Sequence, residues 1–328
     1  MSKKKKPTRV KLIANPGAGD VSTAALRLEQ VTRNLLDMGL EVDVALAKPK
    51  KEAIPIARQA VKDGYDVVIA MGGDGTIGAV IRGMAGSKVS LGIIAAGTAN
   101  DIAASLGIPE DLQEACALIA SGHTRKLDLG QISTRKRKKF YFLMVSTIGL
   151  TATLYPEISE VPEGNWSGIK DALLTVLKYK SNPKVFLTLD DDSKIEVETM
   201  LVTIANTPLT GAKNLVAPDA SMDDGLLDIA VYPGFSKAEL LAYFVKSAHE
   251  GSTPDGRIQR YRARKIKVKT SPKLDVAAEG ILLGKGTARI KILPGALRVL
   301  APAPGSGVEK PLEKTAAALP EPLSQVSR

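Results

Sequence analysis

A buried strand that runs directly into a glycine-rich polar turn constrains the fold of this chain more than any other feature. Residues 66–71 are almost all apolar, and Gly72-Gly73-Asp74-Gly75-Thr76 follows at once. A strand that is apolar along its length is typical of a parallel sheet covered on both faces. Similar strand patterns at 10–14, 41–46 and 90–95 alternate with helical spacing at 23–38 and 52–63. Residues 10–122 therefore predict a parallel sheet with helices on both faces.

The pattern changes after about residue 126, where short alternating segments replace the strand and helix units. Turns rich in Gly, Pro, Asp and Asn separate these segments, and helical spacing interrupts them at 166–179 and 237–248. This arrangement is typical of an antiparallel β-sandwich. Strands are expected at 126–132, 140–147, 185–189, 195–204, 226–231, 260–269, 274–277, 289–292 and 297–300.

These patterns predict an α/β nucleotide-binding domain joined to an all-β sandwich domain. The chain has 328 residues, enough for about two domains. We place the α/β domain at 8–125 and the sandwich at 126–301. Residues 1–7 are basic, and 302–328 hold five of the 19 prolines, so both ends are predicted to be disordered.

The charge balance indicates the kind of partner. Lys and Arg number 45 against 35 Asp and Glu, a net charge of +10 that favours polyanions. Nucleic acid is not expected, because aromatic residues make up only 4% and no nucleic-acid-binding motif occurs. The basic segments 135–139 and 257–269 fit docking on an anionic membrane surface, although such segments also occur as solvated faces.

The numbers of cysteine and histidine residues and the hydropathy of the chain indicate its cellular compartment and the kind of metal that it could bind. Cys116 is the single cysteine, so an intrachain disulfide is excluded and a reducing compartment is expected. With only two histidines, a bound metal should be a hard cation held by oxygen atoms. We find neither a secretory leader nor an uncharged apolar run of about 18 residues, which predicts a cytoplasmic protein peripheral at the inner membrane face.

Three glycine-rich turns stand where strands of the predicted parallel sheet end. They are Asn15-Pro16-Gly17-Ala18-Gly19, Gly72–Thr76 and Gly97-Thr98-Ala99-Asn100-Asp101. Ligands of open parallel sheets bind at this edge, and glycine lets backbone amides approach phosphate oxygens. The three turns together predict a ligand that carries phosphate. Each turn taken alone is better explained as a tight connection between a strand and a helix.

The second turn distinguishes between kinds of nucleotide. Residues 73–78 fit G-x-G-x-x-G, but the acidic residue that a dinucleotide site needs about 20 residues later is missing. Asp74 would repel a bare pyrophosphate, so this turn fits a polyphosphate that carries Mg²⁺. The chain contains no P-loop of the G-x-x-x-x-G-K-[ST] type.

Taken in order, the motifs resemble those of the diacylglycerol kinase and sphingosine kinase superfamily of lipid kinases, in its bacterial diacylglycerol-kinase-like branch. Gly-Gly-Asp-Gly alone is shared with NAD kinases and phosphofructokinases, whereas the block at 218–228 favours the lipid kinases. The similarity covers about residues 8–302. Its motifs are the three turns, Ala205-Asn206, Pro218-x-Ala220-x-x-Asp223-Asp224-Gly225-Leu226-Leu227-Asp228, Glu279-Gly280 and Pro294-Gly295-Ala296-Leu297-Arg298-Val299.

This resemblance implies an active site in the cleft between an NAD-kinase-like α/β domain and a sandwich. It also implies two sets of binding residues. In the first set, Asn15, Gly72, Gly73, Asp74, Gly75, Thr76, Ile77, Gly78, Thr98, Asn100 and Asp101 would bind ATP, with Asp74 also catalytic. In the second set, backbone groups of Ser221 and Leu226 and the carboxylate of Asp224 would hold Mg²⁺.

The general base is where the chain departs from the family. The family carries Asp-Gly-Glu, whose Asp takes the proton of the attacking hydroxyl. Without a gap, that triplet falls on Glu279-Gly280-Ile281, which makes Glu279 the expected base. A shift of one residue places Ala277 at the Asp position and implies a crippled kinase. A third interpretation is that Glu279 is a solvated carboxylate in a turn.

We therefore predict an ATP- and Mg²⁺-dependent lipid kinase that transfers the γ-phosphoryl group to the hydroxyl of a membrane lipid such as diacylglycerol. Two alternatives stay open: an enzyme like NAD kinase, and a non-catalytic member that only binds nucleotide or lipid. The sequence identifies neither the lipid nor the oligomeric state, and a homodimer is compatible with it.

Overall fold

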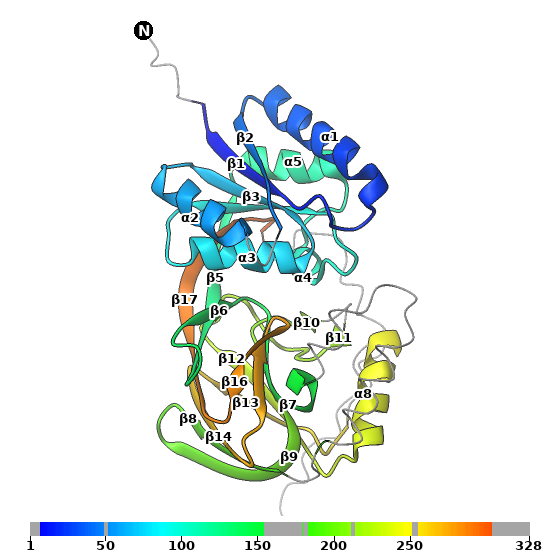
Figure 1. Ribbon diagram of the computed structural model, residues 1–328, viewed down its shortest axis with the longest axis vertical. Helices are drawn as coiled ribbons and strands as arrows, with labels where there is room; N and C mark the ends of the chain where they lie inside the picture. Colours follow the sequence, from blue (N-terminus) through cyan, green and yellow to red (C-terminus); the bar gives the residue numbers. More distant parts are fainter. Residues whose placement is uncertain are drawn as a thin grey trace, which may run out of the picture.

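The computed structural model describes residues 7–48, 52–153, 179, 183–210, 214–250 and 255–303. Two domains are stacked along its long axis, with the N-terminal domain at the top of Figure 1. The predicted helix at 166–179 and the two predicted disordered ends lie almost entirely outside the described residues.

The N-terminal domain contains the predicted parallel sheet. Its strands lie in the order β2-β1-β3-β4, all parallel. Every residue of β3 is buried, because helices cover both faces (Figure 1). The strands are β1 (Arg9–Ala14), β2 (Glu41–Leu46), β3 (Val67–Gly72) and β4 (Ser90–Ala95). One face packs on α1 (Ala24–Asp37), which the exposed turn η1 (Val21–Thr23) precedes, and on α5 (Leu112–Ser121). The other face packs on α2 (Ile54–Lys62), α3 (Asp74–Met84) and α4 (Asp101–Leu106).

The second domain is an antiparallel sandwich, as predicted. Strand β9 contributes to both layers, because its first half pairs with β8 and its second half with β7 and β12. Apolar residues from both layers form one core. The elements are β5 (Thr124–Thr134), β6 (Phe140–Phe142), β7 (Val145–Gly149), β8 (Lys184–Leu189), β9 (Ser193–Ala205), β10 (Leu209–Thr210), β11 (Asn214–Leu215), β12 (Leu227–Pro233), α8 (Lys237–Glu250), β13 (Gln259–Ala263), β14 (Lys265–Ser271), β15 (Asp275–Ala278), β16 (Ile281–Lys285) and β17 (Ala288–Leu300).

Three parts of the predicted strand pattern in this domain were wrong. The segment predicted as one strand at 140–147 is two, because β6 pairs with β5 whereas β7 pairs with β9 and β15. The segment predicted as one strand at 260–269 is two, β13 and β14, which separate at Arg264. β13 pairs with β12, whereas β14 pairs with β8 and β17, so the chain changes layers at this residue. The carboxylate of Asp190 accepts hydrogen bonds from the amides of Arg264 and Lys265, at 2.9 and 2.8 Å. Conversely, the two strands predicted at 289–292 and 297–300 form one strand, β17.

Strands β5 and β17 connect the two domains. They pair with each other over almost their whole length, in an antiparallel ladder interrupted by a bulge between Leu293 and Leu297. Beyond the bulge, Arg298 and Val299 of β17 also pair in parallel with β4 of the N-terminal sheet. The same two strands therefore belong to both domains and fix how the domains meet.

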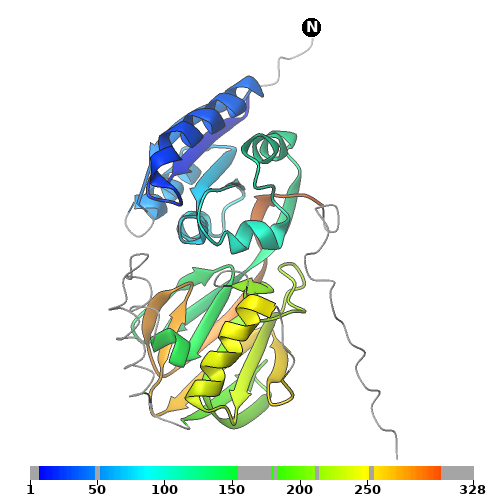
Figure 2. The same cartoon turned by 90° about the vertical axis from the view of Figure 1, so that its right-hand side faces the viewer.

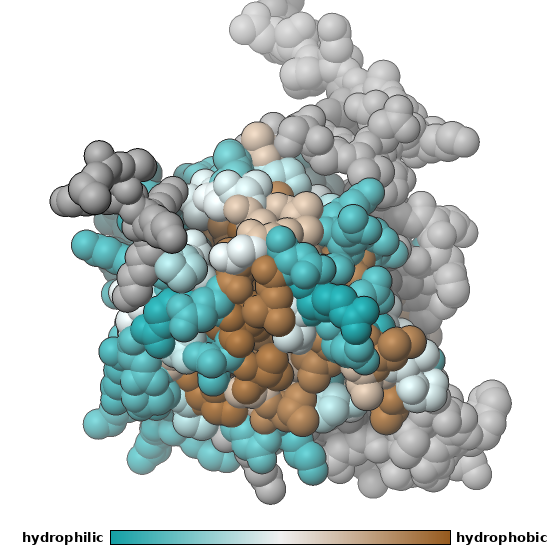
Figure 3. Space-filling view, turned by 90° about the horizontal axis from the view of Figure 1, so that it is seen from above, coloured by the Kyte–Doolittle hydropathy of each residue, from teal (hydrophilic) through white to brown (hydrophobic). Residues whose placement is uncertain are grey.

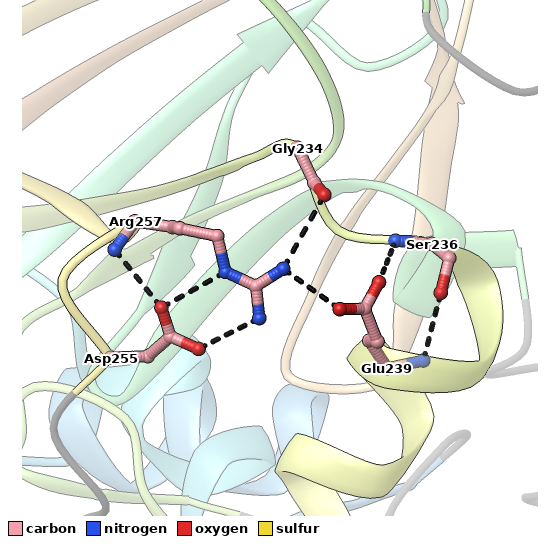
Figure 4. Close-up of polar contacts among 5 residues, drawn as sticks. All are labelled: Gly234, Ser236, Glu239, Asp255 and Arg257. Carbon is pink, nitrogen blue, oxygen red and sulfur yellow. Dashed lines mark hydrogen bonds and ion pairs between the residues drawn. The ribbon is translucent and has the colours of Figure 1, made fainter.

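Helix α8 covers the outer face of the sandwich (Figure 2). Its underside packs on Tyr232 and Phe235. At its start, the Ser236 amide donates to the Glu239 carboxylate at 2.8 Å, and the Glu239 amide donates to Ser236 Oγ at 3.2 Å. This reciprocal pair satisfies two amides that a helix start leaves free. The guanidinium of Arg257 joins Glu239 to Asp255 (Figure 4).

No helix in the described part of the chain is both long and apolar enough to cross a membrane.

We predict that Ser236→Ala lowers the free energy of unfolding by about 1 kcal/mol, because the helix loses its capping hydroxyl. Urea unfolding followed by circular dichroism measures this. Ser193→Ala, at an exposed position at the start of β9, is the matched control and should change stability by less than about 0.5 kcal/mol. Equal effects of the two substitutions would contradict the assignment.

Candidate active site

The three glycine-rich turns meet at the carboxyl edge of the parallel sheet. The side-chain amide of Asn15, after β1, donates to Thr76 Oγ1 at 3.3 Å. After β4, Gly97 lies so close to Gly73 that a Cβ on Gly97 would overlap the Gly73 Cα. Turns from three separate parts of the sequence thus form one surface, as the sequence predicted.

Asp74 and Asn100 hold the third turn in place. Asn100 has a left-handed backbone, with φ of 54°, and its side chain bonds both the amide and the carbonyl of Gly97. The carboxylate of Asp74 accepts from the amides of Asp101 and Ile102, at 3.1 and 2.9 Å. Burial raises the pKa of Asp74, and these two hydrogen bonds oppose that rise. Asp74 therefore caps α4, and a catalytic role for it stays a prediction.

The turns leave one side open. A Cβ added to Gly75 would meet nothing within 4 Å, and the side chain of Thr98 is exposed. Gly75 lies in the first turn of α3, where amides and the helix dipole favour an anion. This geometry suits a phosphate group placed against Gly75 and Thr98.

Glu279 lies in a two-residue turn between β15 and β16. Glu279 and Gly280 have φ of 47° and 72°, the left-handed pair that a tight hairpin of this kind requires. Glu279 Oε1 accepts from the amides of Leu143 and Met144, at 2.6 and 3.1 Å. Its side chain is only 8% exposed. The interpretation of Glu279 as a solvated carboxylate is therefore wrong.

Helix α3 contacts the same carboxylate from the N-terminal domain. Arg82 Nη1 donates to Glu279 Oε2 at 3.0 Å, and its guanidinium lies over the ring of Phe140. A Cβ on Gly78 would stand 2.5 Å from Glu279 Oε2, so a side chain at this position would force the carboxylate to move. Burial lowers the pKa of Arg82, and the charge of Glu279 opposes that shift. Glu279 thus joins both domains beside the glycine-rich turns.

Sequence reasoning missed Arg82 and Asp128. One feature of the sequence could have identified Arg82: it is the only basic residue in α3, the helix at the Gly72–Thr76 turn. Asp128 is 2% exposed between the fully buried Leu127 and Leu129. Its two carboxylate oxygens accept from the amides of Gly225 and Gly295, at 2.6 and 2.7 Å. A lone acid between two core leucines was the only sign of this role.

The predicted metal ligands share the turn that precedes β12. Ser221 Oγ donates to Asp223 at 2.7 Å. The carboxylate of Asp224 accepts from the Leu226 amide at 2.9 Å and forms an ion pair with Arg262. Within the described ranges, no three His, Cys, Asp or Glu side chains are grouped as metal ligands. Asp224 is the one carboxylate of the predicted site, and the Mg²⁺ site stays a prediction.

This combination of fold and site defines a class. A parallel-sheet domain with glycine-rich turns, joined by shared strands to a sandwich that places a carboxylate beside them, is the two-domain architecture of the NAD-kinase and diacylglycerol-kinase folds. The diacylglycerol kinase catalytic domain matches residues 9–132, and the YegS C-terminal NAD kinase β-sandwich-like domain matches 160–301. The chain belongs to the diacylglycerol-kinase-like superfamily, and it is a kinase.

Named relatives agree with this assignment. A diacylglycerol kinase of Bacillus subtilis is 29% identical over 286 residues, covering 83% of this chain and 89% of the relative. One of Mycobacterium tuberculosis is 28% identical over 300 residues, covering 90% and 96%. The crystal structure of a diacylglycerol kinase from Bacillus anthracis has a TM-score of 0.69 and 24% identity, covering 91% and 98%. An NAD kinase from Archaeoglobus fulgidus has a TM-score of 0.50 and 12% identity, covering 89% and 93%. These two structures support the fold alone.

We predict that Gly78→Ala lowers the free energy of unfolding by roughly 1–3 kcal/mol, because the new methyl group displaces the Glu279 carboxylate from its buried hydrogen-bond donors. Gly75→Ala, in the same helix, has open space around it and should be neutral or stabilising by up to about 1 kcal/mol. Chemical denaturation of both variants measures the difference. A Gly78→Ala protein as stable as wild type would show that Glu279 is not held as described.

Proposed function

We propose that the protein is an ATP-dependent lipid kinase that phosphorylates the hydroxyl of a membrane lipid such as diacylglycerol. One observation carries the proposal: the carboxylate of Glu279 lies against Gly78 in the second turn of α3, the helix that begins within the Gly72–Thr76 turn. A hydroxyl brought to this carboxylate would stand next to phosphates bound by the turns.

The turns suit the triphosphate of ATP. Their glycines admit phosphate oxygens close to the backbone, and the helix dipole of α3 favours the negative charge. The open space around Gly75 and the exposed Thr98 would give the γ-phosphate a place at these turns. Mg²⁺ bound with the nucleotide would neutralise phosphate charge, and Asp224 would be available to it once released from Arg262.

In the proposed reaction, the lipid hydroxyl oxygen forms a bond to the γ-phosphorus while the bond to the β–γ bridging oxygen breaks and ADP leaves. The hydroxyl proton passes to Glu279. An ionised carboxylate has about four acceptor sites. The Leu143 and Met144 amides occupy two on Oε1 and Arg82 one on Oε2, which leaves a site on Oε2 for the hydroxyl. Because phosphoryl transfer depends mainly on positioning and charge, a weak base held firmly is sufficient.

Two alternatives to a lipid kinase are each supported by one observation. An activity like that of NAD kinase is compatible with the fold, but the named relatives favour a lipid acceptor. A non-catalytic binding protein would explain why three donors already bind Glu279.

We predict transfer of labelled γ-phosphate from ATP to diacylglycerol in mixed micelles. Glu279→Gln should lower kcat by about 10²–10⁴, because it removes the proton acceptor. Glu279→Asp should retain part of the activity, and Leu282→Ala, at an exposed position in β16, should be unaffected. The same assay with other lipids and with NAD as candidate acceptors, with and without Mg²⁺, identifies the molecule that is phosphorylated. Folded protein that binds ATP but labels no lipid would rule out the proposal.

We further propose that the kinase docks on the anionic cytoplasmic membrane surface through one face of the sandwich. Lys267 lies directly opposite Arg289, and Lys265 opposite Lys291. Like charges in opposite positions destabilise a sheet, so their pairing here favours a polyanionic partner. These side chains line a hollow of about 380 Å³, where Asp191 is the only acidic residue.

We predict that the double variant Lys267→Glu/Arg289→Glu binds phosphatidylglycerol vesicles at least about tenfold more weakly than wild type, since each basic residue at an anionic surface contributes about 1 kcal/mol. Vesicle sedimentation measures binding. Arg33→Glu/Lys62→Glu makes the same change of charge at exposed positions of α1 and α2 and should have a smaller effect. Equal losses would place the membrane contact elsewhere.

A further inference from the structure

Arg82 has hydrogen-bonding capacity that its contact with Glu279 does not use. A guanidinium carries five N–H donors in a fixed fork. One of them, at Nη1, donates to Glu279 Oε2 at 3.0 Å, while Nε is buried with no hydrogen-bond partner in the described part of the chain. A buried donor that stays unpaired costs free energy, so its presence requires an explanation. The arginine is therefore suited to bind a second anion besides Glu279.

The guanidinium lies over the face of α3 that leads to the open first turn of this helix. Gly75, Gly78 and Arg82 are spaced three and four residues apart, which places them on one face. Side chains of a helix lean toward its N-terminus. Accordingly, a Cβ on Gly78 would stand 3.2 Å from Arg82 Nη1. Gly78 follows Gly75 by about 4.5 Å along the helix axis, so the guanidinium lies close to the open space at Gly75.

Phe140 fixes the guanidinium from the other domain. The central carbon of the Arg82 guanidinium is 5.0 Å from the centroid of the Phe140 ring, a cation–π contact. The Arg82 side chain is only 11% exposed. A side chain held in this way keeps its donors in place before a ligand arrives, as a preorganised catalytic group must.

The proposed reaction brings a phosphoryl group to the same place. A hydroxyl that bonds Glu279 Oε2 lies about 2.7 Å from it, and attack requires roughly 3–3.5 Å between that hydroxyl and the phosphorus. The phosphorus therefore comes within about 6 Å of Oε2. Arg82 Nη1 is 3.0 Å from this same oxygen. The guanidinium and the transferring group are neighbours in any such complex.

The glycine-rich turns contain no positive side chain of their own. Residues 15–19, 72–76 and 97–101 include neither Lys nor Arg. Arg27 of α1 contacts the first turn, but its Nη2 donates to the carbonyls of Ala18 and Asp20, at 3.1 and 2.7 Å. Phosphoryl transfer depends on neutralising the charge of the phosphate oxygens. Among the described residues, Arg82 is the basic side chain that contacts the proposed base.

The opposite end of the N-terminal domain has a different character. Helix α3 lies next to the sandwich in Figure 1, whereas Figure 3 looks down on the far end of the domain. Apolar residues form a band across that far end, flanked by hydrophilic ones. An apolar surface cannot replace the water around a phosphate. The end next to the sandwich, where Arg82 and Glu279 meet, is the one suited to phosphoryl chemistry.

We propose that Arg82 is a catalytic residue that binds the transferring phosphoryl group while it holds Glu279. This inference rests on the proposed kinase function and adds a residue to it. As the bond from the γ-phosphorus to the bridging oxygen breaks and the bond to the hydroxyl oxygen forms, Arg82 donates a hydrogen bond to a phosphoryl oxygen. The guanidinium keeps its protons, and the hydroxyl proton still passes to Glu279. One positive charge between two anions lets the carboxylate and the phosphoryl group come together.

A residue that only positioned Glu279 would behave differently in a double-mutant cycle. Labelled phosphate transfer is measured for Arg82→Gln in the wild-type and in the Glu279→Gln background. Contact with the phosphoryl group predicts that Arg82→Gln lowers kcat by about 10²-fold in both backgrounds, with the KM for lipid unchanged. The double variant leaves no unpaired buried charge, so it should stay folded. Arg58→Gln, at an exposed position of α2, is the matched control and should retain wild-type activity.

ADP with aluminium fluoride tests the same contact without a lipid. This complex mimics a phosphoryl group during transfer, and transition-state analogues bind more tightly than ground-state ligands. Isothermal titration calorimetry in the presence of Mg²⁺ should show that wild type binds ADP with aluminium fluoride at least about tenfold more tightly than ADP alone. Arg82→Lys keeps the charge beside Glu279 but loses the fork. This variant should lose most of the difference while its affinity for ADP is unchanged.

The outcomes separate this inference from the proposed function. A wild-type protein that labels no lipid, but whose preference for ADP with aluminium fluoride depends on Arg82, would refute the lipid acceptor and support the role of Arg82. The inference is overturned if Arg82→Gln has no effect on kcat in the Glu279→Gln background. It is equally overturned if aluminium fluoride does not tighten ADP binding, or tightens it to the same extent in wild type and Arg82→Lys.

Discussion

The antiparallel ladder between β5 and β17 is the contact on which the rest of the structure depends. The two strands belong to both domains, so a backbone ladder sets how the domains lie relative to each other. The ladder bends at the bulge before Leu297, and the buried carboxylate of Asp128 bonds the Gly295 amide there. The other oxygen of Asp128 bonds Gly225, next to the predicted metal ligands. One buried acid thus fixes both the bend and the adjoining turn.

Glu279 depends on that fixed geometry. A buried carboxylate is costly unless its charge is paired and its oxygens are bonded. Here the sandwich supplies two backbone amides and the N-terminal domain supplies Arg82. The missing side chain at Gly78 makes room for a carboxylate one methylene longer than aspartate. Three positions far apart in sequence are therefore mutually consistent, which argues against Glu279 as a leftover of a lost site.

Local sequence patterns were sufficient to predict the fold of the N-terminal domain but not all the residues of the candidate site. The buried strand β3 and the glycine-rich turn after it could be predicted from the residues at 66–76 alone, because a run of apolar residues and a cluster of glycines each determine the backbone where they stand. The roles of Arg82 and Asp128 could not be predicted in this way. Their partners Glu279 and Gly225 lie 197 and 97 residues away in the sequence, and hydrophobic periodicity reports only on neighbouring residues. The break at Arg264 was hidden for a similar reason: alternation continues through it, while Asp190 from another hairpin ends the strand.

The sequence also does not show which basic side chains are paired within the protein. Of the basic segment 257–269, Arg257 is bound to Asp255 and Glu239, and Arg262 to Asp224 and Asp228. Those arginines serve internal structure. Beyond the break at Arg264, Lys267 of β14 instead lies opposite Arg289 of β17, while Lys265 lies opposite Lys291 and pairs with Asp191. Because the chain changes layers at that point, topology and not the number of basic residues decides which charges are available to a partner.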